Sequence, residues 1–149
     1  MSQPLNLPSF RPTVRPGSGD RFEVFDPLRR RWVTITPEEE VRQTFVNYLT
    51  AHLGYPAALM ANEHSLTLNG TARRCDTVVF TQALRPLMIV EYKRPTVALT
   101  AKVFDQIARY NSVLGAPWLV VSNGLHHFCC RFNGSGYTFH DRIPLYSEL

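Results

Sequence analysis

The sequence predicts a mixed α/β (α+β) domain in which helices flank a central mixed β-sheet. Two segments, residues 37–53 and 100–114, carry apolar side chains at helical spacing. Short β-type runs lie around and between them, separated by turn signals such as the Asn-Gly pairs at 69–70, 123–124 and 133–134. The expected order is a helix, a three-strand meander, a second helix and further strands.

Both helices have start or stop signals. Thr36 is a suitable N-cap for the first helix, Pro37 suits its first position, and the glutamates at 38–40 complement the helix dipole. Gly54 is expected to end this helix, and Gly115 occupies the C-cap position of the second. Both boundaries therefore follow from local chemistry.

Residues 1–20 are predicted to form an extended arm, and residues 21–149 a single domain. Prolines recur at every fourth position from 4 to 16, which a helix interior does not tolerate. The arm either lies along the domain or a neighbouring subunit, or is a mobile leader. Within the domain, residues 21–36 read as a small hairpin around Asp26-Pro27.

Composition narrows the class of protein. The chain is 44% apolar and 19% charged, without an apolar stretch near the roughly 18 residues of a membrane span. Its three cysteines, at 75, 129 and 130, have no CxxC spacing, which argues against a disulfide framework and the usual zinc sites. A cytoplasmic location is expected. The net charge of +4 is weak support for a nucleic-acid partner.

The strand predicted at residues 87–93 ends in charged residues. Alternation places Glu91 and Lys93 on one face, and the preceding strand carries Asp76. One antiparallel register brings apolar residues opposite apolar residues and acid opposite acid. Its pairs are Phe80 with Leu87, Val78 with Ile89, and Asp76 with Glu91.

Opposed carboxylates indicate a cation. Facing side chains have Cβ atoms about 4.5–5.5 Å apart, at which like charges are destabilising. Mg²⁺ binds one or two carboxylates together with water and phosphate oxygens. Lys93 could then stabilise negative charge or help to deprotonate the nucleophile. Asp76, Glu91 and Lys93 thus predict metal-assisted phosphodiester hydrolysis. The alternative is a solvated salt bridge at a strand end.

These motifs resemble a known class of nucleases. An Asp followed by E-x-K in the next strand is similar to the PD-(D/E)xK superfamily, and "DQIARY" resembles the QxxxY motif of its RecB-like branch. An ordered series of segments extends the likeness over residues 5–146 to the N-terminal nuclease domain family of type I restriction enzyme R subunits. The segments are "LNLP", "FDPLRRRWVTITPEEEVRQ", "LGYP", "RRCDTVVF", "IVEYKRP", "VFDQIARYN" and "VVSNGLHHF".

The resemblance implies a restriction-endonuclease-like fold and roles for five residues. Asp76 and Glu91 would be metal ligands for Mg²⁺, which Mn²⁺ can replace, and Lys93 the catalytic lysine. Gln106 and Tyr110 would line the site and position nucleic acid or the lysine.

Four further residues are candidates. Many relatives carry a metal-site Glu on the first helix, where this chain has Gln43. Glu39 lies one turn earlier on nearly the same stripe and could replace it as a ligand. Arg73 and Arg74 either steer phosphate toward the metal or are plain surface residues.

The resulting hypothesis is a metal-dependent (endo)deoxyribonuclease. Its expected partners are DNA, a helicase or translocase and other restriction-modification subunits, with no membrane and with a homodimer as one option. Because Gln43 replaces the usual Glu, the competing hypothesis is a catalytically inactive, nuclease-fold DNA-binding or scaffold module. A third is a structural interaction module tied together through the arm.

Overall fold

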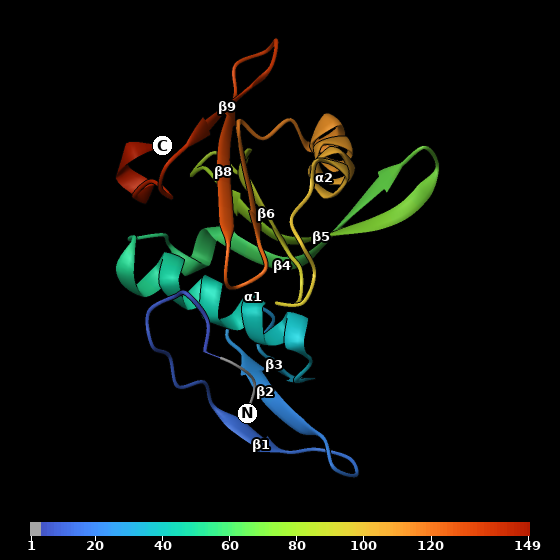
Figure 1. The fold of residues 1–149 in the computed structure, drawn as a ribbon, viewed down its shortest axis with the longest axis vertical. Coiled ribbons are helices and arrows are strands. Elements are labelled where there is room, and N and C mark those ends of the chain that lie inside the picture. The colour runs from blue at the N-terminus through green and yellow to red at the C-terminus, as the bar shows by residue number, and fades with distance from the viewer. Residues whose placement is uncertain (1–3) are drawn as a thin grey trace.

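The computed structural model describes residues 4–149, apart from the side chain of Tyr110, and contains two β-sheets and two α-helices (Figure 1). A small antiparallel sheet has the order β1-β2-β3, formed by β1 (Val14–Pro16), β2 (Phe22–Asp26) and β3 (Arg31–Thr34). The main sheet has the order β4-β5-β6-β7-β8-β9. Its strands are β4 (Met60–Leu68), β5 (Thr71–Phe80), β6 (Pro86–Tyr92), β7 (Trp118–Ser122), β8 (His127–Phe132) and β9 (Tyr137–His140).

The main sheet is mixed and is packed on both faces. Only the β6–β7 pair is parallel among its described pairings, and α2 (Ala101–Leu114) connects these two strands. α1 (Pro37–Asn47) lies between the small and main sheets (Figure 1). It packs on one face through Val41 and Phe45, while α2 covers the other through Ile107. The predicted mixed sheet flanked by helices is confirmed.

The helix boundaries follow the predicted capping, with one difference. The Thr36 hydroxyl accepts a hydrogen bond from the Glu39 N–H at 3.0 Å, and Gly115 ends α2 with φ +69°. The first helix, however, widens after Asn47 into a π-helical turn, Tyr48–His52, in which the Leu53 N–H reaches the Tyr48 carbonyl. Within residues 4–149, neither helix is long and apolar enough to cross a membrane.

The predicted β5–β6 register is confirmed over its central part. Val78 pairs with Ile89, and the neighbouring pair is Thr77 with Val90. The predicted pairing of Phe80 with Leu87 is wrong, because an irregularity after Val79 shifts Phe80 to Pro86. The paired ladder ends one position before Asp76 and Glu91, at the edge where the site lies.

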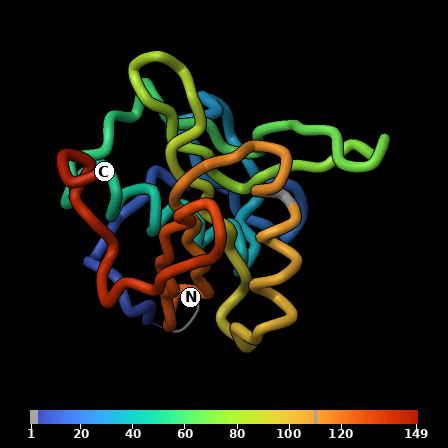
Figure 2. Tube along the Cα trace, turned by 90° about the horizontal axis from the view of Figure 1, so that it is seen from above, coloured from blue at the N-terminus to red at the C-terminus, as the bar shows by residue number. Residues whose placement is uncertain are grey.

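Residues 1–3 of the predicted arm lie outside the described residues, and the rest of the arm lies along the domain. β1 falls within it and pairs with β2. The Asn6 N–H donates to the Gly124 carbonyl at 2.7 Å, and the Asn6 carbonyl lies 2.9 Å from Nε2 of His127. The β4–β5 hairpin, in contrast, extends away from the body of the molecule in both views (Figures 1 and 2).

Phe45 should be a major contributor to stability, because it is fully buried between α1 and the sheet and its ring contacts Tyr92 and His127. We expect Phe45→Ala to lower the free energy of unfolding by about 3–5 kcal/mol in denaturant titrations. Phe139→Ala is the control, since Phe139 is 62% exposed, and should cost less than about 1 kcal/mol. Equal losses would contradict this assignment of the core.

Candidate active site

Three neighbouring strands each carry an acidic residue in one row across the main sheet. Glu63 on β4 lies opposite Asp76 on β5, and Glu91 follows on β6. The pairs that fix the first of these positions are Asn62 with Thr77 and His64 with Cys75. The sheet thus brings together the predicted pair and a third acid that the sequence analysis did not select.

Asp76 and Glu91 are almost closed to water, with exposures of 7% and 8%. The Tyr92 N–H donates to Oδ2 of Asp76 at 2.8 Å, which turns this carboxylate toward β6. Burial and then the adjacent charge of Asp76 raise the pKa of Glu91 well above its ordinary value. Burial also raises the pKa of Asp76, although the Tyr92 N–H and the charge of Arg42 oppose this. Two charged carboxylates are therefore poorly tolerated here.

One atom of the pair has no partner. Oε2 of Glu91 is buried without a hydrogen bond to any residue in the described part of the chain. A buried carboxylate oxygen normally has a donor or a cation beside it. The unpaired oxygen and the raised pKa both fit a divalent cation shared with Asp76.

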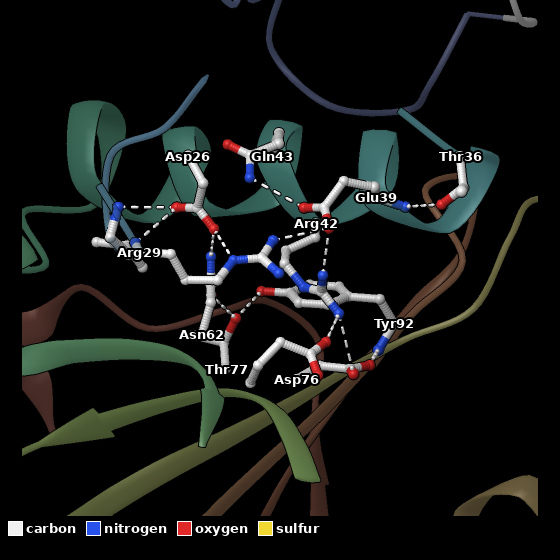
Figure 3. A network of polar contacts seen from close by, with 12 residues as sticks. Asp26, Arg29, Thr36, Glu39, Arg42, Gln43, Asn62, Asp76, Thr77 and Tyr92 are labelled. Atoms are coloured by element: carbon white, nitrogen blue, oxygen red, sulfur yellow. Dashed lines mark hydrogen bonds and ion pairs between the residues drawn. The ribbon is translucent and has the colours of Figure 1, made fainter. Parts of the chain in front are cut away.

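Arg42 of α1 reaches the acidic row from above (Figure 3). Its Nη2 atom lies 2.6 Å from Oε1 of Glu63 and 3.1 Å from Oδ1 of Asp76, while Nη1 lies 2.5 Å from Oε1 of Glu39. Only 4% of Arg42 is exposed. Burial disfavours its charge, yet Glu39 and Asp76 more than compensate and raise its pKa. Arg42 is a permanent internal cation of the site.

Glu63 is held in an unusual backbone conformation. Its φ of +57° is in the left-handed region, although it lies within a strand and is not glycine. Such a conformation costs on the order of 1–3 kcal/mol and persists where the surroundings fix it. The ion pair with Arg42 is one contact that does so here.

The predicted helix candidates, Glu39 and Gln43, bind each other and arginine. Oε1 of Glu39 accepts from Arg29 and Arg42, and its Oε2 accepts from the Gln43 amide at 3.0 Å. Both carboxylate oxygens of Glu39 are thus already engaged, and Gln43 orients them. Because two guanidinium groups already balance the charge of Glu39, this carboxylate needs a metal ion less than the acid pair does, where Oε2 of Glu91 has no partner among the described residues.

A second chain of hydrogen bonds supports the site from the small sheet (Figure 3). Asp26 pairs with Arg29 and accepts from the Asn62 amide at 3.0 Å. The Thr77 hydroxyl donates to the side-chain oxygen Oδ1 of Asn62 at 2.6 Å and lies 2.8 Å from the Tyr92 hydroxyl. Burial raises the pKa of Asp26, but the hydrogen bonds from Asn62 and Arg29 outweigh it and hold the pKa below its ordinary value.

Lys93 lies at the end of β6, where its N–H donates to the Ser122 carbonyl on β7 at 2.8 Å. Its positive charge lowers the pKa of Glu91 and of Glu38 on α1, against the effect of burial. Lys93 is therefore near enough to Glu91 to act on its charge.

Three of the remaining candidates are exposed. Gln106 is exposed on α2, and the side chain of Tyr110 lies outside the described residues. Arg73 and Arg74 are exposed on the extended hairpin. Arg74 is 3.8 Å from Oε2 of Glu63, a loose contact at the rim of the site.

The sequence analysis missed Arg42 and Glu63. Arg42 precedes Phe45 and Leu49 by three and seven positions, so it lies on the apolar stripe of the helix, and a charge there signals a buried ion pair. Glu63 had no comparable signal, because its position depends on the β4–β5 register and on a left-handed φ.

A cavity of about 430 Å³ opens beside these residues. It is lined by Glu38, Glu39, Arg42, Glu63 and Arg94, together with Thr36 and Pro37 at the start of α1. Among the described residues, no three His, Cys, Asp or Glu side chains converge closely enough to hold a metal ion. Asp76 and Glu91 thus remain a pair, which is sufficient for Mg²⁺ when water and phosphate complete its coordination.

The mixed sheet with its two flanking helices is consistent with the restriction-endonuclease-like fold, here with acids in one row across neighbouring strands. The sequence model of the family described as type I restriction enzyme R protein N terminus matches residues 37–144. The chain belongs to this family, which implies a nuclease role. No curated protein compared with the chain matches it significantly.

The raised pKa of Glu91 has a measurable effect on stability without metal. An acid whose pKa is raised by folding contributes stability below its unfolded pKa and loses it as pH rises through the folded pKa. Glu91→Gln removes that charge, so in EDTA at pH 8 it should unfold with a free energy higher than wild type by on the order of 1 kcal/mol. The difference should shrink toward pH 4–5, near the ordinary pKa of about 4.3.

Asp105→Asn, on the exposed face of α2, is the control for this measurement and should change the free energy of unfolding by no more than about 0.5 kcal/mol. A Glu91→Gln protein that is less stable than wild type at pH 8 would show that the charged carboxylate is well accommodated.

Proposed function

We propose that this chain is a metal-dependent nuclease domain that hydrolyses DNA phosphodiester bonds with Mg²⁺, or with Mn²⁺ in its place. The observation that carries the proposal is the buried pair of Asp76 and Glu91, with an unpartnered oxygen on Glu91. Family membership supports the nuclease role, and the basic composition suits a polyanionic substrate.

Asp76 and Glu91 are the residues that would hold the ion. When bound, Mg²⁺ polarises phosphate oxygens and makes a bound water more acidic. Glu39 was an alternative ligand in the sequence analysis, but its oxygens are engaged by Arg29, Arg42 and Gln43. The buried pair of Asp76 on β5 and Glu91 on β6 is therefore the proposed ligand set.

Lys93 would act directly on the substrate. As a cation close to Glu91, its Nζ can stabilise the negative charge that develops on the phosphate during attack. Glu91 would then serve as a metal ligand beside this cation. Arg73 and Arg74 on the extended hairpin would contact the DNA backbone farther from the reacting phosphate.

A second candidate function is a nuclease-fold module that binds DNA or serves as a scaffold without turnover. It is favoured by the ion pair between Arg42 and Asp76, which gives one ligand oxygen a partner other than metal, and by Gln43 in place of an acid. The cleavage assay below separates the two candidates.

We expect the partners to be those of a restriction system. DNA would be the substrate, and a helicase or translocase and other restriction-modification subunits would supply sequence recognition and movement along DNA. A cytoplasmic location and a homodimer stay predictions of the sequence analysis.

The test is nicking of supercoiled plasmid DNA with Mg²⁺ or Mn²⁺. Wild type should nick the plasmid, and EDTA should abolish nicking. Asp76→Asn removes a metal ligand and Lys93→Ala removes the positive charge at the phosphate, so each should reduce the rate at least about 100-fold. Asp105→Asn and Lys102→Ala make the same chemical changes on the exposed face of α2 and should retain the wild-type rate.

Two results would contradict the proposal. DNA binding by gel shift without cleavage in either metal would favour the inactive module. Cleavage that survives Asp76→Asn would place the reaction elsewhere in the chain.

A further inference from the structure

The acidic row has two gaps, one on each side of Asp76, and a cation of the protein itself fills one of them. Oδ2 of Asp76 faces β6, where it accepts from the Tyr92 N–H beside Glu91. Oδ1 faces the other way and meets Nη2 of Arg42, which also binds Glu63 on β4. Asp76 is thus flanked by an acid on each side. Arg42 balances the negative charges of Glu63 and Asp76, and no arginine lies in the same way between Asp76 and Glu91 among the described contacts.

The gap between Glu63 and Asp76 has the chemistry of a cation site. Two carboxylates from adjacent strands converge on a single cationic atom, at 2.6 and 3.1 Å. In two-metal phosphodiesterases, one acid commonly bridges two ions about 3.5–4 Å apart. Asp76 occupies the corresponding middle position here, but the second place is filled by a guanidinium.

Arg42 is well fixed in that place. Its other terminal nitrogen binds Glu39, which is itself held by Arg29 and Gln43. The cavity of about 430 Å³ lined by Glu38, Glu39 and Glu63 leads to Arg42, so ions from solvent can approach the gap. The cavity reaches Glu63 and Arg42, and Asp76 lies behind the guanidinium, outside the cavity lining.

We infer that Arg42 is a built-in cation that takes the place of a second divalent metal ion between Glu63 and Asp76 and limits this site to one metal. The inference rests on one part of the proposed function, namely that the first metal ion binds Asp76 and Glu91. Arg42 is a positioning residue in this scheme, because it holds Asp76 and does not touch the reacting phosphate.

The experiment counts Mn²⁺ ions bound per chain by equilibrium dialysis with electron paramagnetic resonance, and requires no cleavage. Wild type should bind one ion. Arg42→Gln should bind two, because Glu63 and Asp76 then face each other without a cation. Adding Glu63→Gln to Arg42→Gln should return the count to one, since it removes a ligand of the new ion.

Arg74→Gln is the matched control. Arg74 also pairs with Glu63 and carries the same charge, but it is exposed and lies outside the gap, so its replacement should leave one ion bound. Both variants lose one positive charge, but only Arg42→Gln empties the gap between Glu63 and Asp76. An effect of charge alone would therefore raise the number of bound ions equally in both variants. Two ions on Arg74→Gln would therefore overturn the role given to Arg42.

The remaining outcomes are also decisive. Two ions on wild type, or one ion on a folded Arg42→Gln protein, would overturn the inference, whereas no ion on wild type would instead contradict the proposed function. Should Arg42→Gln be unfolded in EDTA, Mn²⁺ must restore its circular dichroism spectrum, because the ion replaces the missing charge. A variant that stays unfolded at saturating Mn²⁺ also contradicts the inference.

Discussion

Like charges brought side by side on three adjacent strands are the constraint around which this domain is organised. Glu63, Asp76 and Glu91 lie in one row, and two of them are more than nine-tenths buried. Carboxylates in so dry a place remain charged only where cations or donors balance them. On the β4 side the balance comes from Arg42, and on the β6 side an oxygen of Glu91 has no partner in the described part of the structure.

This constraint explains why the small sheet and α1 are joined to the main sheet by polar contacts as well as apolar ones. Asp26 at the end of β2 binds Arg29 and Asn62. Further hydrogen bonds join Asn62 to Thr77, and Thr77 to Tyr92 beside the acid pair. The buried side chains from Asp26 through Asn62 and Thr77 to Tyr92 are hydrogen-bonded in series, so removing one would leave its neighbour unsatisfied. The network thereby fixes the position of α1, and with it that of its arginine.

The features that the sequence predicted are those set by local chemistry. Thr36 and Gly115 bound their helices as capping rules require, and the pairing of Val78 with Ile89 follows from matching apolar residues across a hairpin. The ion pairs of Arg42 with Glu63 and Asp76 depend instead on contacts between distant segments. Arg42 is separated from Asp76 by 34 positions. Glu63 has a left-handed φ, which a glutamate in the sequence does not predict.

Gln43 illustrates how charge balance determines what α1 can contribute. A glutamate there would face Glu39 and add a fourth acid to a cluster with Glu63 and Asp76, while the nearby arginines already have carboxylate partners. The amide instead donates to Glu39 and leaves both arginine contacts intact. In this chain the helix therefore brings a cation, Arg42, to the acidic row, and the uncharged amide of Gln43 adds no further negative charge to the buried cluster.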